Sequence, residues 1–412
     1  MKLGCVALTS AAILTAPADA RAERGDGPKG IAPSGYVQVD LVPWRESSRD
    51  EVDPSTGVPR ALQGFSLPRA RARLDAWYDE FEAAIELDAA TIPSPAIRPV
   101  VALVGARVGD DDVGAQLAIG LQKTPFGADA LEENLARLQL ERAVVTDALF
   151  PGIYDLGASV VGHYRGASVT LAAVNGAPIL ERGFAGRDPT ESLDFIGRIA
   201  LDHPLRKELR LLGGVSMLYG KGLHPGTRDT KDELVWRDAN DNGIVELTEI
   251  QVIQGSAATA SATFERFAVG ADVALEVPMP WAGRLRLFAE GVLAKNLDRG
   301  LYIADPVARS RSLRELGYAI GIRQEVTEYA EAGARFDHYD PDFDASEIQG
   351  FEVVPVDPSF DTLAVTVAAR WKVARFIIEY NHRENALGRG DDGRPTTRED
   401  DSFALRAELR FP

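Results

Sequence analysis

Three arginines stand at alternate positions early in the chain: Arg69, Arg71 and Arg73. Successive side chains of a β-strand point to opposite faces, so within a strand all three guanidinium groups would leave the same face. Guanidinium is always charged and binds phosphate or carboxylate through two parallel hydrogen bonds. The spacing therefore predicts a ladder that passes an anion from one arginine to the next. The alternative is a ladder neutralised by the acidic residues of the following stretch: Glu80, Glu82, Glu86 and Asp88.

A second group of cations comprises Arg370, Lys372 and Arg375, and only Glu379 lies near it in sequence. It is the least compensated cationic group of the chain. We predict that these three side chains, like the arginine ladder, border a pathway for anions.

Residues 238–249 match the twelve-residue template of a calcium-binding loop. Gly243 occupies position 6, where the template requires a sharp turn. The stretch therefore predicts a Ca²⁺ site of weak affinity, in the range of about 10⁻⁴ to 10⁻³ M known for extracellular modules. Its role would be to stiffen a loop or to bridge to lipopolysaccharide, and the alternative is a solvated acidic turn. The predicted ligands, with Ile244 acting through its carbonyl, are Asp238, Asn240, Asn242, Ile244, Glu246 and Glu249.

Composition excludes several other kinds of chemistry. The chain has 412 residues, with 62 acidic against 45 basic side chains and a net charge of −17, which argues against a nucleic-acid-binding protein. Its one cysteine, Cys5, precedes the mature part defined below, so a disulfide scaffold or a thiolate site is not expected. Neither a G-x-S-x-G nor an H-E-x-x-H motif occurs, and the five histidines are scattered, so we do not expect an enzyme.

The first twenty residues have the pattern of a secretory signal peptide. Lys2 precedes a short apolar stretch, and Ala18-Asp19-Ala20 resembles a cleavage site. Ala20-Arg21-Ala22 would serve almost as well, so the start of the mature chain is uncertain by about two residues. Residues 21–34 are a polar linker, and residues 35–412 form the main domain, with the calcium-loop-like insertion at 238–249. The chain is predicted to be exported.

Apolar residues alternate with polar or small residues along much of the mature chain, which is typical of β-strands with one apolar face. Residues 113–122 and 402–411 show the pattern clearly. It predicts sixteen strands, at about 35–44, 65–76, 79–89, 98–107, 113–122, 155–164, 167–175, 193–203, 208–219, 262–277, 283–295, 315–326, 328–338, 361–371, 374–383 and 401–411.

The connections between these strands favour a closed barrel over a β-sandwich. Long connections such as 123–154 and 220–261 alternate with tight ones such as 165–166 and 372–373. Outer-membrane barrels have long extracellular loops, short periplasmic turns and an even number of strands of about ten residues. The sequence thus predicts an all-β protein, a 16-stranded antiparallel transmembrane β-barrel. Arginine on the lipid face would cost about 2–4 kcal/mol, so the arginine ladder should face the lumen.

Several short stretches together resemble the phosphate-selective porin family of Gram-negative outer membranes. The resemblance covers nearly the whole mature chain and is most specific at Lys123-Thr124-Pro125-Phe126-Gly127 with the later Glu141-Arg142. The other stretches are 35–40, 64–73, 175–176 and 335–340. The resemblance implies a trimeric, sixteen-stranded barrel that passes anions. Two features depart from the family: Pro412 follows the terminal aromatic Phe411, and the chain is strongly acidic.

We therefore expect an outer-membrane porin that lets small anions such as phosphate diffuse through a constricted lumen. In general porins the third long connection folds into the barrel, so Lys123 and Arg142 are predicted to stand near the constriction. One alternative is a porin of the same fold with little anion preference or with other solutes. The other is an exported calcium-binding β-protein of the cell surface.

Overall fold

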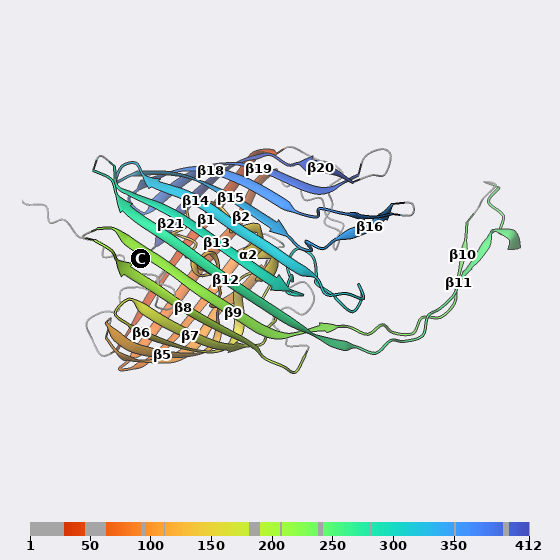
Figure 1. Cartoon of the computed structure of the whole chain (residues 1–412), viewed down its shortest axis with the longest axis horizontal. Helices are drawn as coiled ribbons and strands as arrows, with labels where there is room; N and C mark the ends of the chain where they lie inside the picture. Colours follow the sequence, from red (N-terminus) through yellow and green to blue (C-terminus); the bar gives the residue numbers. More distant parts are fainter. Residues whose placement is uncertain are drawn as a thin grey trace, which may run out of the picture.

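The structure is a computed structural model of the whole chain (Figure 1). It describes residues 29–45, 63–91, 96–110, 112–180, 190–206, 208–237, 242–280, 282–349, 352–389 and 395–411. The predicted signal peptide and Pro412 lie outside these residues, as do Asp238 and Asn240 of the calcium-loop motif.

Sixteen antiparallel strands close into one barrel, which confirms the predicted fold class. Each strand pairs with its neighbour in the chain, and the last barrel strand pairs with the first, Gly35 standing opposite Phe411. The barrel strands are β1 (Lys29–Arg45), β2 (Gly64–Tyr78), β3 (Phe81–Ala90), β4 (Ala96–Gly109), β5 (Val113–Lys123), β6 (Tyr154–Tyr164), β7 (Ala167–Val174), β8 (Asp194–Pro204), β9 (Arg210–His224), β12 (Ala262–Pro278), β13 (Arg284–Lys295), β14 (Arg314–Glu325), β15 (Ala330–Asp340), β18 (Phe360–Trp371), β19 (Ala374–Arg389) and β21 (Ser402–Phe411).

The period-two pattern sorts each strand into an outer and an inner face. Along β3, Phe81, Ile85 and Leu87 are exposed on the outside, whereas Glu86 and Asp88 are buried inside. The outer wall is therefore apolar and the inner wall is rich in charge. No helix of the described residues is long and apolar enough to cross a membrane.

Several strands extend beyond their predicted ends. β1 begins at Lys29 rather than at residue 35, because Lys29–Ser34 pairs with the far end of β2. This part of the predicted linker 21–34 is thus strand, which corrects the expectation. Alternation of apolar side chains marks only the part of a strand that borders an apolar medium, so polar strand ends escape the pattern.

Residues 124–153, which connect β5 to β6 and are called the inner segment below, lie inside the barrel. They contain the short helices α1 (Ala128–Leu131) and α2 (Val144–Leu149), and Figure 1 shows α2 within the outline of the barrel. The inner segment contacts opposite parts of the inner wall. The backbone N–H of Gly127 donates to Ser216 of β9, and the side-chain amide of Asn134 donates to the hydroxyl of Tyr36 on β1.

The wall binds the backbone of the inner segment from several sides. Because helices this short leave most backbone groups unpaired, other polar groups must bond to them. Wall arginines donate to backbone carbonyls: Arg335 to Glu141, Arg375 to Arg137 and Arg406 to Leu140, at 2.9, 2.8 and 2.7 Å. Wall carboxylates accept backbone N–H groups: Glu290 from Asp129, Asp337 from Val144 and Glu379 from Leu140, at 2.8, 3.1 and 2.9 Å.

Apolar packing adds to these bonds. Phe126 and Phe150 pack with their rings tilted at 35° and their centroids 4.9 Å apart, and both belong to a buried apolar cluster that includes wall residues such as Val292. Gly127 has a φ of +72°, and a Cβ there would lie 2.0 Å from a Glu290 oxygen. Only glycine fits this close approach without displacing the carboxylate.

The described residues also form five short strands and one further short helix in addition to the sixteen barrel strands. The connection from β9 to β12 forms an arm that reaches far beyond the rim and carries β10 (Glu233–Trp236) and β11 (Ile250–Ile253) near its end (Figure 1). The short helix η1 (Leu247–Glu249) precedes β11. A second hairpin joins β16 (Ser346–Gln349) to β17 (Glu352–Pro355), and β20 (Pro395–Glu399) pairs with the end of β19.

Candidate solute passage

A cavity of about 470 Å³ remains between the inner segment and one side of the barrel. Its wall residues come mainly from β1, β2, β4, β19 and β21, and the inner segment closes it from the other side. Six arginines line the cavity: Arg45, Arg69, Arg71, Arg98, Arg142 and Arg383. Five carboxylates face them: Asp40, Asp88, Glu141, Asp147 and Glu379.

The predicted arginine ladder points inward, and each of its members is paired with a carboxylate. Arg71 contacts Glu86 at 2.9 Å and Asp88 at 3.4 Å. Arg73 contacts Asp75 at 2.8 Å and Glu86 at 3.2 Å. These contacts correspond to the neutralised alternative, in which cross-strand carboxylates take up the positive charge.

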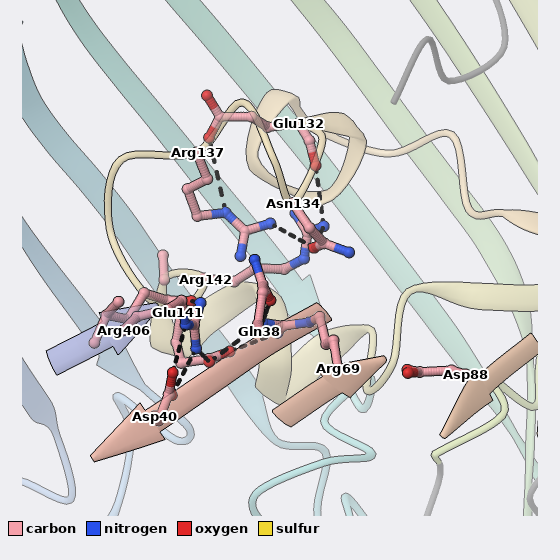
Figure 2. Close-up of polar contacts among 12 residues, drawn as sticks. Gln38, Asp40, Arg69, Asp88, Glu132, Asn134, Arg137, Glu141, Arg142 and Arg406 are labelled. Atoms are coloured by element: carbon pink, nitrogen blue, oxygen red, sulfur yellow. Dashed lines mark hydrogen bonds and ion pairs between the residues drawn. The ribbon is translucent and has the colours of Figure 1, made fainter. Parts of the chain in front are cut away.

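Arg69 is paired with the inner segment rather than with β3. Its guanidinium contacts Glu141 at 2.7 Å, and Glu141 also accepts a hydrogen bond from Arg406 at 2.8 Å. Arg406 in turn holds Asp40 at 2.7 Å, and Figure 2 shows these four side chains gathered together, with Asp88 lying apart. Enclosure of Glu141 would raise its pKa, but the two guanidinium groups outweigh this and hold the pKa well below its ordinary value.

Three of the cavity arginines have no carboxylate partner among the described residues. Arg98 on β4 and Arg383 on β19 make no ion pair or side-chain hydrogen bond there. Arg142 donates to the backbone carbonyl of Asp129, to that of Glu132 and to the side chain of Asn134, all of which are neutral groups. Figure 2 shows Arg142 beside Glu132 and Asn134. None of the three guanidinium groups therefore forms a direct ion pair with a carboxylate among the described residues.

Two cavity carboxylates likewise have no cationic partner among the described residues. Glu379 accepts bonds from Leu140 N, Thr366 and Asn381, which are neutral donors. Asp147 on α2 is exposed to the cavity inside the barrel. The surrounding protein, which displaces part of the water around the carboxylate, and nearby Glu141 raise the pKa of Asp147 to about 6. Apart from its ion pairs, the cavity thus carries three cations against two carboxylates at neutral pH.

Lys123, predicted at the constriction, lies outside the lining of this cavity. It is buried at the end of β5, and its ammonium contacts Glu133 at 2.9 Å and the carbonyl of Leu131 at 3.3 Å. Arg142, its predicted partner, does border the cavity. Of the two residues predicted at the constriction, Arg142 thus borders the cavity, whereas Lys123 is buried in an ion pair with Glu133.

The second cationic group is divided between different environments. Arg370 and Arg375 both contact Glu331, at 3.0 and 2.7 Å, and Arg375 also reaches the inner segment. Lys372 lies in the tight turn between β18 and β19, where its ammonium is 5.1 Å from the ring centroid of Trp371. Two of the three residues expected to be the least compensated are thus paired with Glu331, which lies too far away in sequence to be foreseen.

The described part of the calcium-loop motif comprises Asn242, Ile244, Glu246 and Glu249. Asn242 accepts a hydrogen bond from the backbone of Ile244 at 2.7 Å, and Glu249 accepts one from the indole of Trp236 at 3.1 Å. Among the described residues, no group of three or more histidine, cysteine, aspartate or glutamate side chains is placed to hold a metal ion. Calcium binding stays a prediction.

Sequence reasoning missed Arg98, Arg383 and Asp147 as cavity residues. Arg383 stands four and eight positions after Glu379 and Arg375 on one face of β19, so the alternation carried a usable signal for it. No comparable signal marks Asp147, because its position depends on how the inner segment folds.

The chain matches no protein-family model and no curated protein sequence. Its barrel is similar to solved structures at low sequence identity. The outer-membrane channel DcaP of Acinetobacter baumannii is 11% identical, with a TM-score of 0.55 over 94% of this chain and 99% of that one. The anion-selective porin from Comamonas acidovorans is 10% identical, with a TM-score of 0.53 over 93% and 100%. The trimer form of OmpT from Vibrio cholerae is also 10% identical, with a TM-score of 0.53 over 93% and 100%. The likeness establishes a shared barrel fold.

Proposed function

We propose that the chain is a porin of a Gram-negative outer membrane that passes small anions through the cavity beside its inner segment. The apolar outer wall and charged inner wall fit a barrel that spans lipid and encloses water. The observation that carries the anion preference is the set of three cavity arginines without a carboxylate partner among the described residues: Arg98, Arg142 and Arg383.

The likeness to porin structures supports the proposed location, oligomeric state and ion preference. An outer-membrane location and a homotrimer agree with the neighbours, one of which is described as a trimer form. The likeness to an anion-selective porin agrees with the direction of the preference. Phosphate is considered as a solute because of the sequence resemblance to phosphate-selective porins, and it is one of the anions to be tested.

The deciding experiment is the reversal potential of single channels in a planar bilayer under a KCl gradient, repeated with phosphate. We expect an anion-directed potential that falls in Arg98→Gln and Arg383→Gln. Arg165→Gln is the matched control, because Arg165 lies in the turn after β6, away from the cavity. A cation-directed potential would refute the anion preference, and the absence of any channel would refute the porin.

A weakly selective porin is the second candidate, favoured by the ion pairs of Arg69, Arg71 and Arg73. If these pairs dominate, the reversal potential is near zero and neither glutamine variant moves it. The same bilayer measurement therefore separates the two candidates.

A further inference from the structure

The cavity has an apolar lining beside its arginines. Val100 and Ile153 line it and are 2% and 3% exposed, and both belong to the apolar cluster that anchors the inner segment. Ile179 packs against the same cluster and also borders the cavity. Leu140 and Val42 give a second apolar contact area. A cavity of this volume with apolar walls and a few charged groups has the character of a small-molecule site.

An inorganic dianion such as phosphate matches only part of this lining. Its oxygens are charged on all sides and need hydrogen-bond donors or water all around. Against Val100, Ile153 and Ile179 those oxygens would lose water without gaining a donor. A carboxylate with an apolar body separates the two needs, because its charged end accepts two bonds from a guanidinium while its body covers apolar wall.

We infer that the cavity preferentially binds monocarboxylates with an apolar body, such as medium-chain or aromatic acids, over hydrated inorganic anions. The carboxylate end would meet the arginines that lack a carboxylate partner among the described residues, Arg98 and Arg383. Val100 follows Arg98 by two residues on β4, so one strand supplies both a charged and an apolar contact. This inference rests on the porin proposed above and names its solute class.

The test is block of single-channel chloride current by acetate, butyrate, hexanoate, benzoate and phosphate. Each buried methylene contributes about 0.8 kcal/mol, which corresponds to about a four-fold change in affinity when fully buried. We expect the blocking affinity to rise about two- to four-fold per methylene from acetate to hexanoate, with benzoate also a stronger blocker than phosphate. Equal block by acetate and hexanoate, or strongest block by phosphate, would overturn the inference.

Variants on one strand isolate the apolar contact. Val100→Thr keeps the side-chain shape and replaces one methyl group by a hydroxyl, and we expect it to lower the hexanoate-to-acetate ratio about three-fold or more. Val104→Thr is the matched control, because Val104 lies on the outer face of the same strand and is 59% exposed. Ile179→Thr, in the connection between β7 and β8, tests the same wall if Val100→Thr fails to assemble.

The chloride reversal potential, recorded in the same experiment, distinguishes failure of the inferred solute class from failure of the proposed anion porin. An anion-directed potential without chain-length dependence would overturn the solute class and leave the anion porin standing. A potential of zero or of cation sign would refute the proposed function itself. A hexanoate-to-acetate ratio that Val100→Thr and Ile179→Thr lower no more than Val104→Thr does would also overturn the assignment to this cavity.

Discussion

Asp147 is the cavity carboxylate whose charge changes closest to neutral pH. Its pKa of about 6 means that it is largely ionised at pH 8 and largely neutral at pH 5. Protonation removes one of the two carboxylates that oppose Arg98, Arg142 and Arg383. The channel should therefore be more anion-selective at pH 5 than at pH 8, with a midpoint near pH 6.

Reversal potentials measured between pH 5 and pH 8 check this prediction. Asp147→Asn should show the acid-type selectivity at every pH in that range. Asp110→Asn, in the exposed turn between β4 and β5, should keep the wild-type pH dependence. Persistence of the midpoint in Asp147→Asn would assign the titration to another group.

For the arginine ladder, the sequence predicted the direction of the side chains better than it predicted their ion-pair partners. Alternation placed Arg69, Arg71 and Arg73 on one inward face, and the structure has them there. The carboxylate that holds Arg69 is Glu141, 72 residues away in a segment without a regular repeat. Such partners depend on how the inner segment folds against the wall, which local spacing does not encode.

The inner segment owes its fixed position to elements of the wall, and Arg375 of β19 offers a way to test this. Arg375 donates to the carbonyls of Leu135 and Arg137 at 3.2 and 2.8 Å. Hydrogen bonds from a charged donor contribute about 1.5–3 kcal/mol each. Arg375→Met should therefore loosen the segment, which would be seen as greater open-channel current noise and faster proteolysis within residues 132–142.

Arg370→Met is the matched control for this loosening. Arg370 contacts the same carboxylate, Glu331, but it makes no hydrogen bond to the inner segment among the described residues. In either variant Glu331 keeps Arg323, whose Nε lies 2.7 Å away, so the carboxylate is not left unpaired. Equal noise in both variants would show that loss of charge near Glu331, rather than loss of the segment's attachment, is responsible.

The arm that carries β10 and β11 provides an optical test of the calcium prediction. Glu249, at position 12 of the motif, accepts a hydrogen bond from the Trp236 indole. A calcium ion that recruits this carboxylate would disturb that bond, so millimolar CaCl₂ should change the tryptophan emission. The change should be absent in Trp236→Phe and in Glu249→Gln. If millimolar calcium produced no heat in a calorimetric titration and no change in emission, the calcium site would be refuted.

At the scale of the whole molecule, the apolar outer wall makes a prediction about stability in lipid. Val365 lies on the outer face of β18 and is 45% exposed. Val365→Arg should lower the free energy of unfolding from lipid vesicles by about 2–4 kcal/mol if the position is near the bilayer centre. Val365→Leu should change it little, and urea titrations followed by circular dichroism provide the measurement. Equal stability of the two variants would argue against lipid at this wall.

The barrel as a whole was predictable because one physical pattern repeats in every strand. Outward side chains that face an apolar medium and inward ones that face polar groups impose a period of two, as along β5 and β21. The same reasoning could not find the long polar ends of β9 and β19, nor the fold of the inner segment. Those parts are specified by pairing with particular partners rather than by the medium around them.

The pairing of β1 with β21 has a consequence for how the chain reaches its native state. Gln38 and Glu408 hydrogen-bond at 2.8 Å although 370 residues separate them. The seam between the two ends can form only after the last strand has been synthesised and delivered, and closing so long a loop carries a large entropic cost. Until then two unpaired edges are available to other chains, and such edges template aggregation. A helper protein that covers an open strand edge during transit would therefore raise the yield of closed barrel, and the yield should fall as chain concentration rises.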